Sequence, residues 1–365
     1  MPPASDLRLI AYSGSGSLNF RAGQPERFVP AATGSSMTNS FQPRKPAGSP
    51  HGGQFDSKPH AVMDAALDSK ASVIPDKLAG AVVVGAHLDG RNFYKRHAED
   101  LSMKDCTLTD TIFDRANLNR LYATCCTLDG TRFDNADMTY GLITDCTGDA
   151  TMCGANMDRL SIWSSHLTVD ATQSYMRKAD ISNTVLSGSR FEGADFTAAH
   201  ISDSDLNAAR LHRADLGYTR VTNTDMTNTD MTYADLTQAR LTLTNLGYAN
   251  MDSTQWEGAC AYDSCMDHAL ITNAEMKSSE FINTTAVGAE IADCSIKRCT
   301  FEGVDFTDAT FKGNHVQGDT TFEECDFTGV DLTGNWWRRV TFAGCTLGEA
   351  NTTFLKGLPD VTVKD

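Results

Sequence analysis

Proline is nearly absent from most of this 365-residue chain, and its distribution divides the sequence in two. Eight of the ten prolines lie in residues 1–60, and none lies between Pro75 and Pro359. Residues 1–60 are also rich in Ser and Gly and poor in acidic residues, a composition that buries too little apolar surface to offset the entropy of ordering. We therefore expect residues 1–60 to form a disordered tail ahead of a folded part.

The chain also lacks an excess of positive charge and any long apolar run. Lys and Arg total 31 against 47 for Asp and Glu, which gives a formal net charge of −16 at pH 7. Such acidity argues against nonspecific binding to nucleic acids or anionic membranes and favours a partner with a basic surface. No run of about 18 apolar residues occurs, so we expect no transmembrane segment and no cleaved signal peptide.

Cysteines are present, but the patterns that would give them chemistry are missing. The eleven cysteines are an odd number and include no C-x-x-C pair, so we expect reduced thiols rather than a disulfide framework. No H-E-x-x-H motif occurs and the nine histidines are scattered, which argues against zinc. The sequence shows no pairing of a nucleophile with a base. We therefore predict no metal, no cofactor and no enzymatic activity.

What the sequence does have is a repeat of five residues. Over residues 176–316 a large apolar side chain recurs at every fifth position, with only Ala261 and Ala286 as small exceptions. The residue two positions earlier is Ala, Ser, Thr or Cys in 27 of these 29 repeats. The same pattern, with more exceptions, extends over residues 83–347 and gives 52 repeats in all.

A period of five fits neither an α-helix nor an alternating strand, so the chain must turn within every repeat. Residues two apart in an extended stretch point the same way, so the large residue and the small one share the interior. Polar residues fill the other three positions. Repeats such as ADLTQ, ADFTA and ANMDS match the pattern A(D/N)LXX of the pentapeptide-repeat family, which the chain resembles over residues 76–350.

This resemblance implies an all-β fold, a right-handed quadrilateral β-helix with four repeats in each coil. The 52 repeats would make about 13 coils, and a rung spacing of about 4.8 Å gives a rod ~60 Å long. We expect residues 61–75 and 351–365 to cap the two ends, the first as a short Ala-rich helix.

The five-residue register slips at three places, after Ile143, after Leu167 and after Val316. Slips in a solenoid correspond to bulges, kinks or exposed loops. We therefore expect residues 144–176 to be the least regular part of the rod.

The position of a residue in the repeat also predicts its burial. Six cysteines occupy the small interior position, where Ala is usual, and are expected to be core residues. They are Cys106, Cys126, Cys294, Cys299, Cys325 and Cys345. Because Cys106, Cys126 and Cys146 are one coil apart, as are Cys325 and Cys345, we expect them to stack in ladders.

Charged residues at outward positions also recur once per coil. Asp195, Asp215 and Asp235 should share one side of the rod, and we interpret most such aspartates as solvated scaffold. The positions of His200, Arg220 and Arg240 predict a ladder on the neighbouring side, where an anion site is the alternative to a solvated face.

Two surface features stand out as candidate binding sites. The first is an acidic band over residues 225–293, with eleven acidic and two basic residues, whose charge density matches that of duplex DNA. Its candidate contact residues are Asp225, Asp230, Asp235, Asp252, Glu257, Asp263 and Asp267.

The second feature is the segment Asn335–Arg339, with the sequence NWWRR. The repeat places Trp337 inward and Trp336, Arg338 and Arg339 outward. Trp and Arg are enriched at binding hot spots, so the outward residues are candidates for partner binding. The alternative is that they support the C-terminal cap.

These features favour a non-enzymatic protein-binding scaffold. A Ser-, Gly- and Pro-rich tail ahead of a rod resembles bacterial type III secreted effectors with pentapeptide repeats. The resemblance implies a protein made in the bacterial cytoplasm and delivered into a host cell without a cleaved signal peptide. We expect its partner to be a protein, with a second copy of the chain as another candidate.

Two other functions remain open. Some pentapeptide-repeat proteins mimic DNA and bind gyrase or another topoisomerase, and the acidic band agrees with that role. Other effectors carry a pentapeptide β-helix that binds substrate ahead of a ubiquitin-ligase lobe, and the chain could be such a β-helix. The sequence stops at Asp365, soon after the last repeat, so we expect no catalytic lobe.

Overall fold

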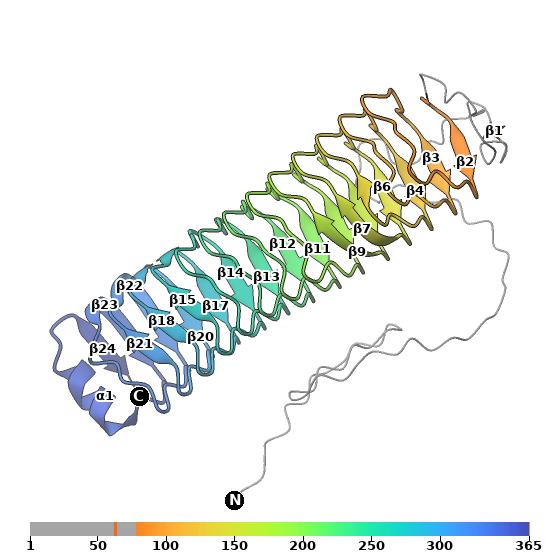
Figure 1. Cartoon of the computed structure of the whole chain (residues 1–365). Coiled ribbons are helices and arrows are strands. Elements are labelled where there is room, and N and C mark those ends of the chain that lie inside the picture. The colour runs from red at the N-terminus through yellow and green to blue at the C-terminus, as the bar shows by residue number, and fades with distance from the viewer. Residues whose placement is uncertain (1–61, 64–77, 365) are drawn as a thin grey trace, which may run out of the picture. The chain divides into compact units, whose positions relative to one another are not determined.

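The computed structural model describes residues 62–63 and 78–364. These residues form an all-β parallel solenoid of about 14 turns with almost no helix, which confirms the predicted fold class (Figure 1). The predicted tail over residues 1–60 lies outside the described residues.

Each repeat folds as an extended stretch that ends in a turn. In the repeat around Phe196, the large side chain and the small Ala194 are both fully buried. Ala198, two residues after the large one, takes the left-handed conformation with φ of 59°. The N–H of Ala199 then donates to the carbonyl of Phe196 at 2.8 Å. One corner per repeat is therefore what produces the five-residue period.

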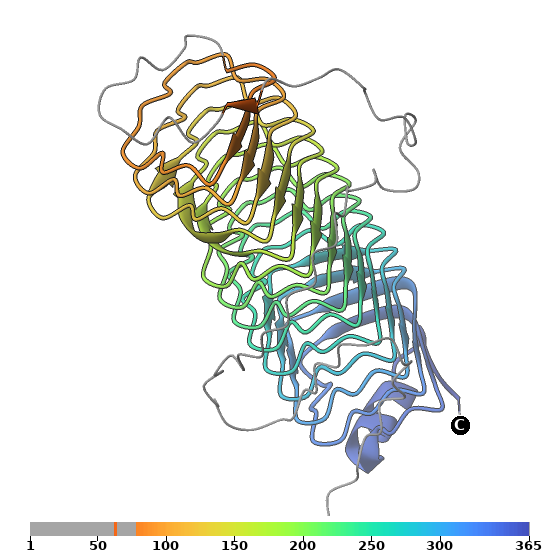
Figure 2. The same ribbon diagram turned by 90° about the vertical axis from the view of Figure 1, so that its right-hand side faces the viewer.

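Strands of successive coils pair in parallel, so that each residue lies beside its equivalent in the next coil, as Ile181 does beside Ile201. The longest ladder forms one side of the rod, which we call the main face, and Figure 2 shows its strands stacked from coil to coil. In order along the rod this ladder contains β1 (Val62–Met63), β2 (Val82–Val84), β3 (Ser102–Lys104), β4 (Tyr122–Thr124), β6 (Leu142–Thr144), β8 (Ser161–Trp163), β10 (Asp180–Ser182), β11 (His200–Ser202), β12 (Arg220–Thr222), β13 (Arg240–Thr242), β14 (Cys260–Tyr262), β17 (Glu280–Ile282), β20 (Thr300–Glu302), β22 (His315–Glu323), β23 (Trp336–Ala343) and β24 (Val361–Lys364).

Shorter ladders lie on the other sides. One contains β5 (Thr131–Arg132), β7 (Thr147–Thr151) and β9 (His166–Asp170), and another contains β15 (Leu270–Thr272), β18 (Glu290–Ala292) and β21 (Thr310–Lys312). A third consists of β16 (Glu275–Lys277) and β19 (Ser295–Lys297), and it continues through the first residues of β22 and β23. We call the side that carries this third ladder the lateral face.

Residues 144–176 depart from the regular coil, as the register slips predict, but they do so through longer strands and not through the expected bulge, kink or loop. Ile143 pairs with Ile162, and Ile162 pairs with Ile181, so each of these two coils is one residue shorter than the coil from Ile181 to Ile201. The missing residue is taken from a corner, which leaves β7 and β9 as continuous five-residue strands that pair residue for residue (Figure 1). A deletion is thus accommodated here by a longer strand rather than by a loop.

The slip after Val316 does form the predicted bulge. β22 pairs with β23 in two registers, and the register shifts between Gln317 and Thr320. The extra residue lies at Gly318 and Asp319, both with positive φ. An insertion is therefore placed at a corner, between two paired stretches of the same strand.

The two ends of the solenoid are built differently. Val62 and Met63 pair in parallel with Val82 and Val83 of β2, so the predicted Ala-rich helix is wrong at these two residues. They extend the main face by one rung instead. Residues 64–77, which include the rest of that predicted helix, lie outside the described residues.

At the C-terminal end, α1 (Gly348–Lys356) precedes β24, which pairs with Val340–Ala343 of β23. Leu355 of α1 is fully buried. Asn351 fixes the helix on the last coil, because its side-chain amide donates to the carbonyl of Val330 at 2.7 Å. In the described part of the chain, no helix has the length and apolar character needed to span a membrane.

Candidate protein-binding surfaces

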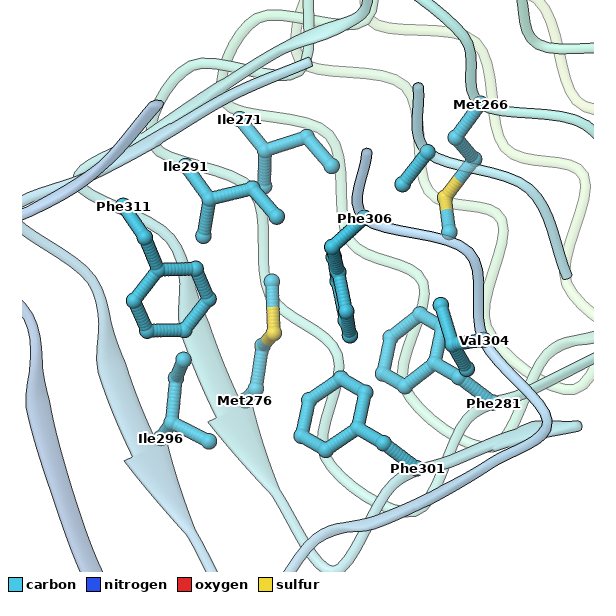
Figure 3. Close-up of a pocket in the computed structure, with 11 residues that line it drawn as sticks. Met266, Ile271, Met276, Phe281, Ile291, Ile296, Phe301, Val304, Phe306 and Phe311 are labelled. Atoms are coloured by element: carbon cyan, nitrogen blue, oxygen red, sulfur yellow. The ribbon is translucent and has the colours of Figure 1, made fainter. Parts of the chain in front are cut away.

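The interior of the described coils is filled mainly by apolar side chains and contains a small cavity. This cavity has a volume of about 10 Å³, room for roughly one water-sized sphere. Its lining side chains, which include Met266, Phe281 and Phe306, point toward one another inside the coils (Figure 3). Ala286 also lines it, at a position where most repeats have a large residue. The cavity is thus a packing defect beside a small residue.

The structure places the interior cysteines as the repeat predicts. Cys106, Cys126, Cys294, Cys299 and Cys325 are buried, and Cys345 is half-buried. Their thiols donate to backbone carbonyls, as in Cys294 to Ala292 O at 3.3 Å. Burial raises the pKa of Cys294 to about 12, so this thiol stays protonated. Within the described ranges, no group of three or more His, Cys, Asp or Glu is placed to hold a metal ion.

Most outward aspartates stabilise the turn that follows them. One carboxylate oxygen accepts a hydrogen bond from the backbone N–H two residues later, as Asp235 does from Thr237 at 2.8 Å. Asp225 does so from Thr227 at 2.9 Å, and Asp230 from Thr232 at 3.1 Å. These three candidate residues are therefore parts of the scaffold, as the sequence predicts for outward aspartates.

The other acidic candidates bind polar groups of the next coil. Hydrogen bonds from Thr272 and Asn273 lower the pKa of Asp252 below its ordinary value. The remaining contacts join Glu257 to Lys277 as an ion pair, Asn283 Nδ2 to Asp263 at 3.2 Å, and Val287 N to Asp267 at 2.9 Å. These contacts hold neighbouring coils together.

The acidic band does not gather on one side of the rod. Asp225, Asp230 and Asp235 belong to three separate ladders, which continue to Asn245, Asn250 and Gln255. Their carboxylates are therefore distributed around the rod. A partner lying along one side would contact only some of the seven candidate residues.

The second predicted ladder is present on the main face. His200, Arg220 and Arg240 pair in register and are all exposed. Asp180 Oδ1 lies 3.6 Å from His200 Nδ1, and Arg240 Cζ lies 5.8 Å from the centroid of the Tyr262 ring. Two of the three basic side chains thus have a partner within the rod.

Segment Asn335–Arg339 has the orientation that the repeat predicts. Trp337 is buried and stacks on Phe311 with ring centroids 5.9 Å apart. Trp336 is 45% exposed and contacts the His315 ring at 5.6 Å. Arg338 and Arg339 are exposed. The three outward residues therefore lie on the lateral face at its C-terminal end, and β24 begins its pairing only at Val340.

Sequence analysis missed two further cations beside this segment. Lys297 pairs with Gln317, and Gln317 pairs with Arg338, so Lys297 and Arg338 lie in one column two rungs apart. Arg298 follows Lys297 at the corner. We call Lys297, Arg298, Trp336, Arg338 and Arg339 the basic patch. The coil from Lys297 to Gln317 has the regular length, but the coil from Gln317 to Arg338 is one residue longer. A search of the sequence for cations spaced by whole regular coils therefore does not reveal the column.

Exposed tyrosines form another surface feature that sequence analysis missed. Arginine side chains lie over several of these tyrosine rings. Arg159 Cζ lies 5.2 Å from the centroid of the Tyr140 ring, and Arg213 Cζ lies 5.7 Å from that of Tyr233. Tyr248 is 63% exposed and stacks on His268 instead. These rings lie at corners of separate repeats, so they do not form a continuous patch.

Comparison with known families matches more than half of the chain to pentapeptide repeats. The model described as "Pentapeptide repeat region" matches residues 274–352, and "Pentapeptide repeats (8 copies)" matches residues 102–139, 174–213 and 209–247. The chain belongs to the pentapeptide-repeat family. Neither family model indicates a catalytic activity.

Solved structures of pentapeptide-repeat proteins resemble the chain at low sequence identity. HetL, a protein involved in heterocyst differentiation regulation in the cyanobacterium Nostoc sp. strain PCC 7120, has 15% identity and a TM-score of 0.38, covering 56% of this chain and 89% of its own. QnrB1, a plasmid-mediated fluoroquinolone resistance protein, has 14% identity and a TM-score of 0.40, covering 48% of this chain and 91% of its own. No curated protein matches the chain.

Proposed function

We propose that this pentapeptide-repeat protein is a non-enzymatic scaffold that binds another protein. The observation that carries the proposal is Trp336, a large aromatic side chain that is 45% exposed and flanked by exposed arginines on a regular rod. Exposing such a ring gives up burial free energy of the order of 1–2 kcal/mol. Trp and Arg together at one site are typical of binding hot spots.

A rod of paired coils suits this role because it holds outward side chains in fixed rows. Little backbone entropy is lost when such a surface binds, since the ladder already fixes the backbone. The half-buried and exposed residues of the lateral face are held in this way by β19, β22 and β23.

Site-specific crosslinking tests the scaffold proposal. A photo-crosslinking amino acid is placed at Gln317, beside Arg338, and a control at Lys104, on the distant β3. The full chain is irradiated with extract from the producing bacterium and, separately, from a host cell. We expect a defined crosslinked protein at Gln317 that is lost when Trp336→Ala is added. Identical products at both positions, or none at Gln317, would contradict the proposal.

We further propose that the scaffold acts as a secreted effector on a host protein. This proposal is supported by the composition of residues 1–60, which is rich in Ser, Gly and Pro and poor in acidic residues. Residues 1–75 fused to a translocation reporter should enter host cells from a bacterium with a type III secretion system. Delivery should disappear in a secretion-null strain. Equal signals in the two strains would rule out this route.

The acidic band supports a second candidate, binding to gyrase or another topoisomerase in place of DNA. Its net charge of −9 over residues 225–293 is distributed around the rod, as phosphates are around a duplex. The full chain should then inhibit or protect gyrase in a supercoiling assay at micromolar concentration. Unchanged supercoiling would eliminate this candidate and leave the scaffold proposal intact.

A further inference from the structure

The basic patch is a cationic area on an acidic protein. It is formed by two rows of cations on the lateral face, Lys297 and Arg298 at the end of β19 and Arg338 and Arg339 in β23. Gln317 of β22 lies between the rows, so they are two rungs apart, about 10 Å at the usual rung spacing. Trp336 lies in the same strand as the second row.

Three of these four cations have no carboxylate partner among the described residues. Arg339 is paired with Asp319 at 3.6 Å, and both side chains are well exposed. Lys297, Arg298 and Arg338 form no ion pair in the described coils. Many arginines elsewhere on the rod are paired, including Arg120 with Asp100, Arg132 with Asp114 and Arg177 with Asp158. The basic patch therefore retains positive charge that the chain itself does not neutralise.

The bulge in β22 shapes this area. Gly318 has φ of +77°, and a Cβ on it would lie 3.1 Å from Lys297 Cγ and 3.4 Å from Arg298 Cγ. The stems of both side chains therefore lie against this glycine, where a larger residue would displace them. β24 pairs only with Val340–Ala343, so no described strand follows Trp336–Arg338 along the rod. Trp336 consequently keeps a free ring surface beside the cations.

We propose that the basic patch is the docking site for a short acidic segment of the partner protein, with an apolar side chain that packs on Trp336. This inference rests on the proposed scaffold function and names the chemistry of the partner. Carboxylates of the segment would form ion pairs with Lys297, Arg298 and Arg338, which have no carboxylate partner among the described residues. Arg also binds carboxylates in a bidentate manner, which orients the segment.

A short segment fits better than a long polyanion. At physiological ionic strength charges act over about 8 Å, so the local field is set by the patch and not by the whole chain. Beyond the patch lie Glu275, Asp293 and the rest of the acidic band. A nucleic acid or an anionic membrane extends over those carboxylates and is repelled by them, whereas an acidic segment of a few residues stays within the patch.

Fluorescence anisotropy with the full chain tests the proposal. The probe is a fluorescein-labelled octapeptide of Asp and Glu with one central Phe, and its Asn and Gln counterpart is the neutral control. We expect saturable binding of the acidic peptide that weakens as salt is raised, and no binding of the neutral peptide. Lys297→Glu with Arg338→Glu should weaken binding by about tenfold or more, and Trp336→Ala should weaken it by a few fold.

The matched control is Lys104→Glu with Lys178→Glu, which makes the same change in net charge at exposed positions outside the patch. It should bind the acidic peptide within about twofold of the unmodified chain. Thermal melting checks that each variant is folded. The proposal is overturned if the peptide does not bind, if the control loses as much affinity as the patch variant, or if an oligonucleotide or phosphatidylserine vesicle binds more tightly. Such a failure alongside a specific Gln317 crosslink would leave the scaffold function standing and show that the contact at the lateral face does not depend on an acidic segment.

Discussion

Two stretches of the solenoid depart from the regular coil length in opposite directions. Between Ile143 and Ile181 each coil is one residue short, and the shortage removes a corner and lengthens strands β7 and β9. At β22 the coil that spans the bulge is one residue longer than a regular coil, and the extra residue forms the bulge at Gly318 and Asp319. Both changes leave the parallel ladder of the main face continuous.

The difference shows where a solenoid can vary its surface. A deletion extends the paired stretch, whereas an insertion leaves pairing intact on both sides and adds an outward corner. Phe322, in the strand that contains the bulge, stacks on Phe301 and Phe342, with centroids 4.8 and 4.9 Å apart. The lengthened stretch also carries the basic patch, on which the proposed docking of a partner rests.

The largest effect is expected from truncating the aromatic stack of the long coils. Phe322 is fully buried between two parallel rings, so Phe322→Ala should lower the free energy of unfolding by about 3–5 kcal/mol. Urea unfolding followed by circular dichroism measures the loss. Ile162→Val in the short coils is the comparison, with an expected loss of about 1 kcal/mol. A loss for Phe322→Ala no larger than that for Ile162→Val would contradict the close packing of the Phe322 ring.

Glycines at the two irregular stretches should differ in their tolerance of a side chain. Gly148 in β7 has φ of +112°, and a Cβ there would lie 2.8 Å from Asp129 N. Gly148→Ala should therefore cost about 3 kcal/mol. The Lys297 stem can move away from Gly318, so Gly318→Ala should cost about 1–2 kcal/mol.

Gly188 in a regular coil supplies the control, because it has φ of +69° and no atom within 4 Å of an added Cβ. Gly188→Ala should cost about 1 kcal/mol, the conformational term alone. The measurement is the shift in urea midpoint for the three variants. A cost for Gly148→Ala no larger than that for Gly188→Ala would contradict the close pairing of β7.

Adding the same side chain at two interior alanines should have unequal costs. Ala214 lies at the small position of a regular coil, so Ala214→Leu should destabilise by roughly 1–3 kcal/mol through overpacking. Ala286 lines the cavity, which accommodates part of the added side chain, so Ala286→Leu should destabilise by about 1 kcal/mol or less. Differential scanning calorimetry compares the two. A larger loss at Ala286 than at Ala214 would show that the cavity cannot accept the side chain.

The smallest effect concerns thiol reactivity beside the long coils rather than stability. A hydrogen bond from Cys325 lowers the pKa of Cys345 below its ordinary value. The thiolate fraction of Cys345 therefore rises at a lower pH than that of an ordinary thiol, and alkylation by iodoacetamide should rise over the same lower pH range. Peptide mass spectrometry measures the rates, with Cys294, whose pKa burial raises to about 12, as the unreactive control. A midpoint near that of an ordinary thiol, about 8.5, would contradict the lowered pKa.

The regular part of the fold was predictable because one period fixes both the interior positions and the corners. The burial of Ala194, Phe196 and Trp337, and the exposure of Trp336, follow from counting in fives. The five-residue strands β7 and β9 were not predictable in this way, since the count shows that a residue is missing but not whether a corner is lost or a loop is formed. The decision depends on backbone pairing with the coils on either side.

The surface was predictable only where the coils keep their regular length. The ladder of His200, Arg220 and Arg240 follows from that length, and the structure contains it. The sequence did not predict that Lys297 and Arg338 share one column, because the residue inserted at the bulge moves Arg338 one position away from the regular spacing. Which coil absorbs an insertion is decided by local backbone geometry, here by the positive φ of Gly318 and Asp319.

Hydrogen exchange of the native full chain, followed by mass spectrometry, tests the central claim that short and long coils belong to one continuous ladder. The account predicts that peptides covering β7 and β9 are protected as strongly as those covering β11 and β12, and that reduced protection near β22 is confined to the bulge at Gly318 and Asp319. Rapid exchange throughout residues 144–176 would contradict it, because that result would mean loops where the structure has paired strands.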